Sequence, residues 1–170
     1  MNTDNNFRST NPFVEQRITN ATSWIGTYPG LSNNIAKGQT FLAPAEADVE
    51  TIEIYSSLVT DPGEVVLTLH SFDPENKSWG PSIGSSSVQF TSTDAGRWVA
   101  FNLPRLRLAK GKSYGFKLQS SDSFIGVGEA AGSHQQPPFS SGQEWKFSGN
   151  NSNADSFSYF SLAFKVGLRA

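Results

Sequence analysis

Short runs in which apolar and polar residues alternate are the feature that most limits what this chain can fold into. The clearest run lies near the C-terminus, and its apolar members are Phe160, Leu162, Phe164, Val166 and Leu168. Successive side chains of a β-strand point to opposite faces, so this period of two predicts a strand with one buried face and one wet face. Shorter runs of the same kind lie around residues 41, 49–54, 65–69, 88–90, 99–103, 114–118, 125–127 and 145–147. We therefore expect about nine or ten strands and hardly any helix.

The segments between these runs are rich in residues that favour turns. The clearest are Asp61-Pro62-Gly63, Asp73-Pro74-Glu75-Asn76, Asp94-Ala95-Gly96 and Lys110-Gly111-Lys112. Proline presets one backbone angle, and glycine permits conformations that other residues avoid. Strands that follow one another at intervals of about 8–12 residues with such turns are typical of sandwiches and barrels. The sequence thus predicts a two-sheet antiparallel β-sandwich.

The first thirty residues form a separate feature of the chain. Residues 1–30 are rich in polar side chains, yet they also contain apolar ones, namely Phe7, Phe13, Ile18, Trp24, Ile25 and Tyr28. So many apolar groups do not suit a solvated tail. We expect an N-terminal arm over residues 1–30, packed either on its own domain or on a neighbouring copy, followed by the sandwich domain over residues 31–170.

Composition limits the class of partner. Charged residues make up 16% of the 170 residues, and the net charge is −2. This balance suits a neutral, hydroxyl-rich ligand or a protein neighbour, whereas nucleic acids require a basic face. No apolar run approaches the roughly 18 residues that a membrane-spanning helix needs. We expect neither nucleic-acid binding nor membrane insertion.

Cysteine and the N-terminal residues bear on chemistry and location. The chain contains no cysteine, which excludes disulfides, thiolate zinc sites and a cysteine nucleophile. Residues 1–20 contain no apolar core of a signal peptide, so the sequence itself leaves the compartment open. We expect no cofactor, with a structural calcium ion as an open alternative, because a site made of loop carbonyls leaves little trace in a sequence.

Two glycine-containing motifs resemble catalytic or cofactor-binding signatures. Residues 80–84 match the G-x-S-x-G pattern around Ser82, but that pattern works only between a strand and a helix, and we expect a turn between two strands here. Residues 126–131 resemble the dinucleotide-binding pattern, but Pro137 and Pro138 would break the helix that must follow it. We therefore expect no enzymatic activity.

Aromatic and amide side chains in the connecting segments are the candidate ligand-binding residues. They are Trp79, Trp145 and the stretch His134, Gln135 and Gln136, of which Trp145 opens an expected strand. Such residues offer stacking surfaces and amide donors, as a glycan site requires. In the alternative interpretation, these rings close the open ends of the sandwich.

Several core and turn residues resemble one family of bacterial domains. Gln39-Thr40-Phe41 opens a core strand, Trp98 and Phe101 lie on another, and Leu108, Gly111 and Tyr114 form a turn and the strand after it. Over residues 38–168 this pattern is similar to that of galactose-binding-like, carbohydrate-binding-module-like jelly-roll domains, which are often attached to secreted or surface proteins.

The resemblance implies a fold, a function and a location. The fold would be a jelly-roll sandwich, the function lectin-like binding of a glycan or another neutral ligand without catalysis, and the location extracellular or on the cell surface. None of the matching residues is a ligand residue of that family. A structural or assembly subunit of a homo-oligomer, fibre, shell or appendage, self-associating through the N-terminal arm, stays the alternative.

Overall fold

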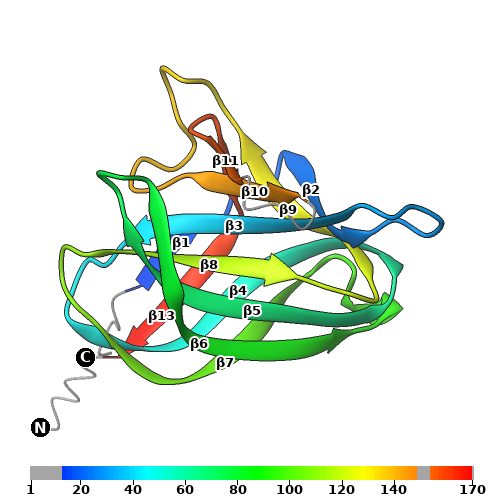
Figure 1. Cartoon of the computed structure of the whole chain (residues 1–170), viewed down its shortest axis with the longest axis horizontal. Helices are drawn as coiled ribbons and strands as arrows, with labels where there is room; N and C mark the ends of the chain where they lie inside the picture. The colour runs from blue at the N-terminus through cyan, green and yellow to red at the C-terminus, as the bar shows by residue number, and fades with distance from the viewer. Residues whose placement is uncertain (1–12, 149–153, 170) are drawn as a thin grey trace, which may run out of the picture.

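The computed structural model describes residues 13–148 and 154–169, and these segments are built almost entirely from β-strands (Figure 1). The only helical element among them is a single 3₁₀ turn, η1 (Ser92–Asp94). All strand pairs are antiparallel. The expected all-β class is therefore confirmed.

The strands follow the alternating runs closely, but they number thirteen rather than nine or ten. Their bounds are β1 (Phe13–Gln16), β2 (Ala21–Thr27), β3 (Asn34–Leu42), β4 (Ala47–Asp61), β5 (Gly63–Asp73), β6 (Ser78–Phe90), β7 (Arg97–Leu108), β8 (Ser113–Gln119), β9 (Phe124–Ala131), β10 (Glu144–Ser148), β11 (Ala154–Phe157), β12 (Phe160–Leu162) and β13 (Phe164–Arg169). The last alternating run is divided at Ala163, whose N–H donates to Gly128 O. Strands β1, β2 and β11 are too short, or their alternation of apolar and polar residues is too irregular, to be predicted from the sequence pattern.

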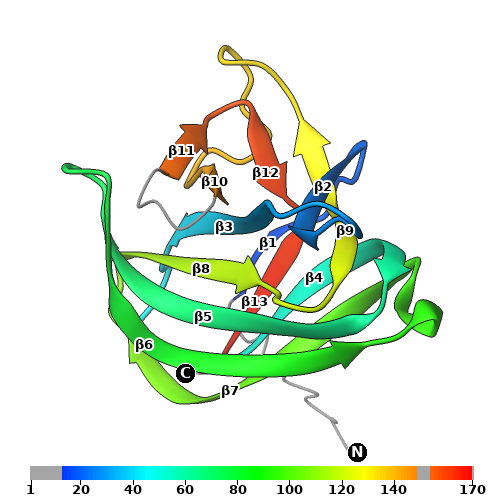
Figure 2. The ribbon, with the colours of Figure 1, turned by 45° about the vertical axis from the view of Figure 1, so that its right-hand side comes forward.

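All thirteen strands belong to one hydrogen-bonded sheet that curls on itself (Figure 2). The main path runs β1-β13-β4-β9-β2-β3-β8-β5-β6, with β7 paired to β4, β12 to β9, β10 to β3 and β11 to β10. The 15-residue strand β4 makes the curl possible. Its first part pairs with β7 and β13, and its last part pairs with β9.

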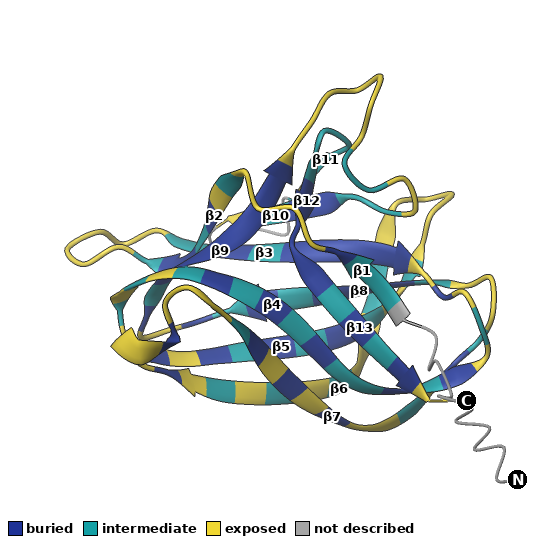
Figure 3. Ribbon diagram, turned by 180° about the vertical axis from the view of Figure 1, so that it is seen from behind, coloured by how far each residue is buried: buried dark blue, intermediate teal, exposed yellow. Residues whose placement is uncertain are grey.

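The core fills the inside of the curl, and its members come from alternate positions of the facing strands (Figure 3). In β13, Phe164, Val166 and Leu168 are buried, whereas Lys165 is only half-buried and Arg169 is exposed. The same alternation holds in β5, where Val65, Leu67 and Leu69 are fully buried. The register read from the sequence is therefore the register of the structure in these strands.

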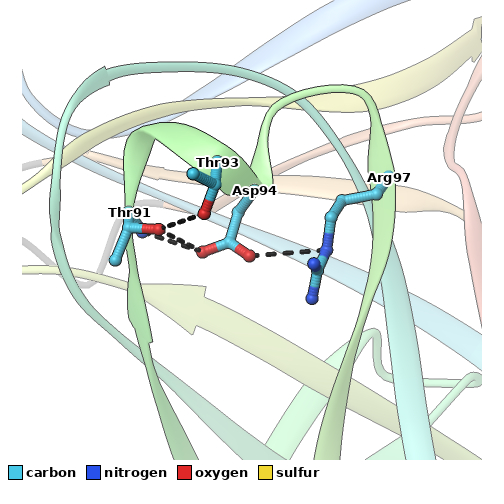
Figure 4. Close-up of polar contacts among 4 residues, drawn as sticks. All are labelled: Thr91, Thr93, Asp94 and Arg97. Atoms are coloured by element: carbon cyan, nitrogen blue, oxygen red, sulfur yellow. Dashed lines mark hydrogen bonds and ion pairs between the residues drawn. The ribbon is translucent and has the colours of Figure 1, made fainter.

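The expected turns lie where the sequence puts them. Gly96 and Gly111 adopt the left-handed backbone conformation, with φ of 78° and 79°, which suits glycine. Between β6 and β7, the Asp94 carboxylate accepts hydrogen bonds from the Thr91 N–H at 2.8 Å and from the Thr91 hydroxyl, and it lies 3.4 Å from Arg97 Nε (Figure 4). This carboxylate holds the tight connection between two edge strands.

The described part of the N-terminal arm consists of strands. β1 pairs with β13 of the same chain, and β2 pairs with β9 and β3. Ile25 is fully buried in the core, whereas Tyr28 and Ile18 are largely exposed. Residues 1–12, with Phe7, lie outside the described residues.

Two segments that the sequence indicates as irregular lie in a strand. Trp79 and the whole of residues 80–84 lie inside β6. The Ser82 hydroxyl donates to Gly84 O at 3.1 Å, and an extended strand continues on both sides of it. Glycine, proline and serine in these runs suggest a turn, but pairing with β5 keeps the chain extended. Residues 126–131 likewise lie in strand β9.

None of the described residues belongs to a helix long and apolar enough to cross a membrane.

The alternation in β13 predicts unequal costs for two neighbouring truncations. Phe164 is fully buried among Phe41, Phe116 and Phe139, so Phe164→Ala should lower the free energy of unfolding by about 3–5 kcal/mol. Lys165 points to the other face, where its ammonium group lies 4.1 Å from the Trp98 ring centroid, so Lys165→Ala should cost only about 1 kcal/mol. Chemical denaturation of both variants measures the difference, and equal losses would contradict this register.

Candidate functional site

A pocket of about 360 Å³ opens where β2 and β3 diverge. β2 pairs with β3 only through Gly26 and Thr27 and otherwise follows β9, whereas β3 continues beside β8 and β10. Strands β10, β11 and β12 close the other side, above β3 in Figure 2. The pocket is lined by Thr22, Ser23, Trp24, Ile35, Lys37, Glu129, Glu144, Lys146, Phe157 and Phe160.

Strand register sends four ionisable side chains to this pocket. Glu144 lies opposite Gln39 in the β10–β3 pair, and Lys146 lies opposite Lys37. Residues 144 and 146 are two apart, so they share one face of β10. Glu129 comes from β9. The two glutamates and two lysines therefore converge from three strands, of which β3 lies far from β9 and β10 in the sequence.

The two glutamates form a buried pair. Glu144 is 1% exposed and Glu129 is 6% exposed. Burial, hydrogen bonding to Glu129 and the negative charge of Glu129 raise the pKa of Glu144 to about 10, against the opposing effect of Lys37. Glu144 thus keeps its proton at neutral pH.

Burial also lowers the pKa of Lys37, and the nearby Lys146 adds to that effect, while Glu144 and Glu129 oppose it. An ionisable cluster of this kind, in a hollow and with its pKa values displaced by burial and by specific partners, marks a functional-site candidate.

Two polar atoms of the pocket have no hydrogen-bond partner among the described residues. They are Ser23 Oγ, whose residue is 3% exposed, and Glu144 Oε1. A buried polar group without a partner costs about 1–3 kcal/mol. Ser56 Oγ and the indole nitrogens of Trp79 and Trp145 are also unpartnered, but their residues do not line this pocket. Of the buried, unpartnered polar atoms, only those of Ser23 and Glu144 therefore belong to residues that line this pocket.

Aromatic rings form the apolar part of the wall. Trp24 is stacked on Phe124 with ring centroids 4.7 Å apart and an interplanar angle of 8°. A side chain at Gly126 would collide with Thr22 and crowd this indole, since its Cβ would lie 2.7 Å from Thr22 Cγ2 and 3.2 Å from Trp24 Cζ3. Phe157 and Phe160 complete the wall from β11 and β12. The pocket therefore offers flat apolar surfaces beside its donors and acceptors.

Trp79 and Trp145, two of the residues singled out from the sequence, lie together in an aromatic cluster on the outside of the sheet. The ring of Trp79 packs edge-on against Trp145 at 5.9 Å and Phe147 at 5.3 Å, and also against Phe72 and His70. Trp145 is 5% exposed. His70 is half-buried and donates from Nδ1 to Gly80 O at 2.9 Å.

His134, Gln135 and Gln136 lie apart from that cluster, exposed in the loop between β9 and β10. The His134 ring packs against Tyr159 at 4.8 Å, and its Nδ1 lies 2.8 Å from Ser158 Oγ. Tyr159 in turn contacts Phe157 and Phe160. His134 therefore packs against the turn between β11 and β12, which carries the wall residues Phe157 and Phe160. It does not itself line the pocket.

The residues that line the pocket were not singled out from the sequence. Glu144 and Lys146 flank Trp145, and they point to the opposite face of β10 from it. Glu129 lies within the run that resembles the dinucleotide pattern. The available signal was a glutamate at a buried position of a strand, because a buried carboxyl group in a sheet requires a partner.

Among the residues that the structure describes, no group of three or more histidine, aspartate or glutamate side chains is placed to hold a metal ion.

Comparison with protein-family models and with curated proteins found no match for the chain. The resemblance to carbohydrate-binding-like jelly-roll domains thus stays an expectation.

The Trp79 ring sits directly on two glycines, which yields a prediction about the cluster. A Cβ at Gly115 would lie 2.5 Å from Trp79 Cη2, so Gly115→Ala should lower the free energy of unfolding by about 1–3 kcal/mol. In a Trp79→Ala background the same substitution should cost much less, because the obstructing ring is gone. Denaturation of the four proteins of this double-mutant cycle measures the coupling. Additive costs would show that the ring does not occupy this position.

The protonated state of Glu144 predicts a pH dependence of stability. In the unfolded chain Glu144 ionises near its ordinary pKa of 4.5, whereas in the folded protein its pKa is about 10 and it keeps its proton below that pH. The folded state thus binds one more proton between these values, and stability is lost as pH rises. Glu144→Gln, whose amide can still donate to Glu129, should remove this slope of up to about 1.4 kcal/mol per pH unit.

Chemical denaturation between pH 5 and pH 9 measures this slope, and Glu75→Gln in the exposed β5–β6 turn is the matched control. Parallel profiles for the wild type and the Glu144→Gln variant would contradict a protonated Glu144.

Proposed function

We propose that this protein is a non-catalytic, carbohydrate-binding-like module, and that the pocket around Glu129 and Glu144 holds a sugar ring. The observation that carries the proposal is the buried, unpartnered hydroxyl of Ser23 in the wall of a polar pocket. A ligand hydroxyl can restore the missing hydrogen bond, and this restores the free energy that its burial costs.

The chemistry of the pocket matches a polyhydroxylated ring. Protonated Glu144 and the amino groups of Lys37 and Lys146 are donors, and Glu129 is an acceptor. A sugar hydroxyl is both donor and acceptor, so a wall of mixed character can satisfy it. Trp24, Phe157 and Phe160 provide apolar faces for the C–H surface of the ring. The volume of about 360 Å³ lies in the range of small-molecule sites.

The proposed fold family supports the same function. The strands β7, β4, β13 and β1 form one side of the curl and β6, β5, β8 and β3 the other, an order compatible with the proposed jelly-roll sandwich, in which β9 and β2 would join the two sheets. Together with the residues that resemble carbohydrate-binding-like domains, it favours an extracellular or cell-surface module that binds a glycan.

One observation favours the alternative, an assembly subunit. Tyr28 and Leu31, in the loop between β2 and β3, are 52% and 62% exposed, and Tyr28 packs edge-on against Phe124. Exposed apolar groups that adjoin one another often mark a contact with another protein. The molecular mass in solution distinguishes the two functions, since a monomer favours the binding module and a large ring or polymer favours assembly.

A substitution of Ser23 tests the proposed site. Protein clustered on beads, so that weak single sites act together, is screened against a glycan array. Ser23→Ala should weaken binding of the recognised glycan by about 2- to 13-fold, the equivalent of one neutral hydrogen bond of about 0.5–1.5 kcal/mol. The same substitution should leave the free energy of unfolding unchanged or raise it, because the hydroxyl has no partner in the free protein.

The matched control is Ser56→Ala. Ser56 is also buried and unpartnered, and it lies across β9 from Ser23, opposite the same Val127, but it does not line the pocket. This variant should bind as the wild type does. A blank array from well-folded, clustered protein, or equal losses in the two variants, would contradict the proposed site.

A further inference from the structure

Two lysines of the pocket lie directly opposite each other on neighbouring strands. Lys37 of β3 is the cross-strand partner of Lys146 of β10, and both line the pocket. Like charges in directly opposed positions of a sheet are destabilising. Neither lysine has a carboxylate oxygen within 4.0 Å in the described part of the chain.

The nearest acidic groups leave this pair unneutralised. Glu144 holds its proton, which leaves the Glu129 carboxylate as the anion that lines the pocket. Asp155 lies opposite Lys146 on β11, but it is exposed to solvent and forms no ion pair with it. The two amino groups, one of them partly desolvated, therefore outnumber the single anion Glu129, and neither forms an ion pair with it.

A second hollow adjoins the first at the same lysine. It has a volume of about 310 Å³ and is lined by Asn33, Asn34, Ile35, Lys146 and Ser148. Ile35 and Lys146 belong to both hollows. Lys146 thus stands at the junction of a charged pocket and a neutral, amide-lined one, where two consecutive units of a chain ligand can lie side by side.

We propose that the ligand is an acidic oligosaccharide, and that the carboxylate of one uronic-acid-type residue lies between Lys37 and Lys146 while the adjacent sugar occupies the second hollow. This inference rests on the proposed function and names its substrate class. A carboxylate between the two ammonium groups accepts a hydrogen bond from each and relieves their repulsion. Ser23 and the Glu129–Glu144 pair then bind the hydroxyl groups of the same ring.

A pair of matched probes tests the assignment by calorimetry. The probes are a short oligogalacturonate and the neutral galactose oligomer of the same length, whose rings differ in the carboxylate. The wild-type protein should bind the acidic probe about tenfold or more tightly than the neutral one, the equivalent of a charge-assisted hydrogen bond. The difference should shrink with added salt.

Lys146→Met should abolish this preference, because it should weaken binding of the acidic probe far more than binding of the neutral probe, which loses only one neutral hydrogen bond. The methionine keeps the length and apolar stem of lysine without its charge. Lys110→Met, in the exposed turn between β7 and β8, is the control for net charge and should keep the preference. Circular dichroism and thermal unfolding confirm that both variants fold.

Each outcome decides between the two proposals. A preference that is lost in Lys146→Met and kept in Lys110→Met supports the acidic-saccharide site. Equal or tighter binding of the neutral probe overturns this inference and leaves the proposed function standing. A preference that persists in Lys146→Met, or falls equally in both variants, overturns this inference, because it then reflects general charge attraction rather than a site at Lys146. Tighter binding of a sulfated galactose oligomer overturns the carboxylate assignment. Failure of every saccharide to bind overturns the proposed function as well.

Discussion

The pairing of one long strand on both of its edges is the constraint on which the rest of this structure depends. The first part of β4 is held between β7 and β13, and its last part crosses to β9. Because β9 also pairs with β2, this single strand joins the two sides of the curl. The apolar residues of both sides then face one another and form one core, with Ile52 and Ile54 of β4 fully buried within it. Any register slip in β4 would turn those side chains outward and separate the two sides.

The same pairing explains why a polar pocket lies beside an apolar core. β9 follows β4 and draws β2 with it, while β3 stays with β8, so a gap opens between β2 and β3. Filling that gap with apolar side chains would extend the core. The chain instead places two carboxyl and two amino groups there, of which Glu129 and Glu144 are almost completely buried. Replacing a buried ionic cluster by well-packed apolar residues is often neutral or stabilising, so packing alone does not explain this choice.

Much of the fold could be predicted from sequence, because period-two alternation depends only on which face is buried. Phe164, Val166 and Leu168 were expected inside and are inside. The prediction of an irregular segment at residues 78–84 was wrong for a physical reason. These residues favour a turn, but pairing with β5 overrides their local preference. The same override places Trp79 in a strand rather than a loop, over glycines that leave room for its ring.

The pocket itself could not be predicted in this way, because its residues become neighbours only through long-range pairing. Glu129 and Glu144 are separated by a loop, and Lys37 lies on a strand more than ninety residues earlier in the chain. Aromatic and amide residues in expected loops led instead to Trp145 and His134. These two lie immediately behind the pocket: Trp145 is on the reverse face of the strand that carries Glu144, and His134 is behind the ring of Tyr159. Strand register decides which face of each strand enters the pocket, and the composition of single segments does not show it.

The three strands that close the pocket contribute more to its wall than to the apolar core. β10, β11 and β12 lie off the main path of the sheet, and β11 has no buried side chain. Of the buried residues in β10, Trp145 belongs to the outer aromatic cluster and Glu144 to the pocket. Only Leu162 of β12 joins the apolar core. A sheet that needed these strands for stability would bury more apolar surface through them, since burial is the main favourable contribution to folding. Their principal contribution is therefore the wall made by Glu144, Lys146, Phe157 and Phe160, which turns a divergence between two strands into a pocket.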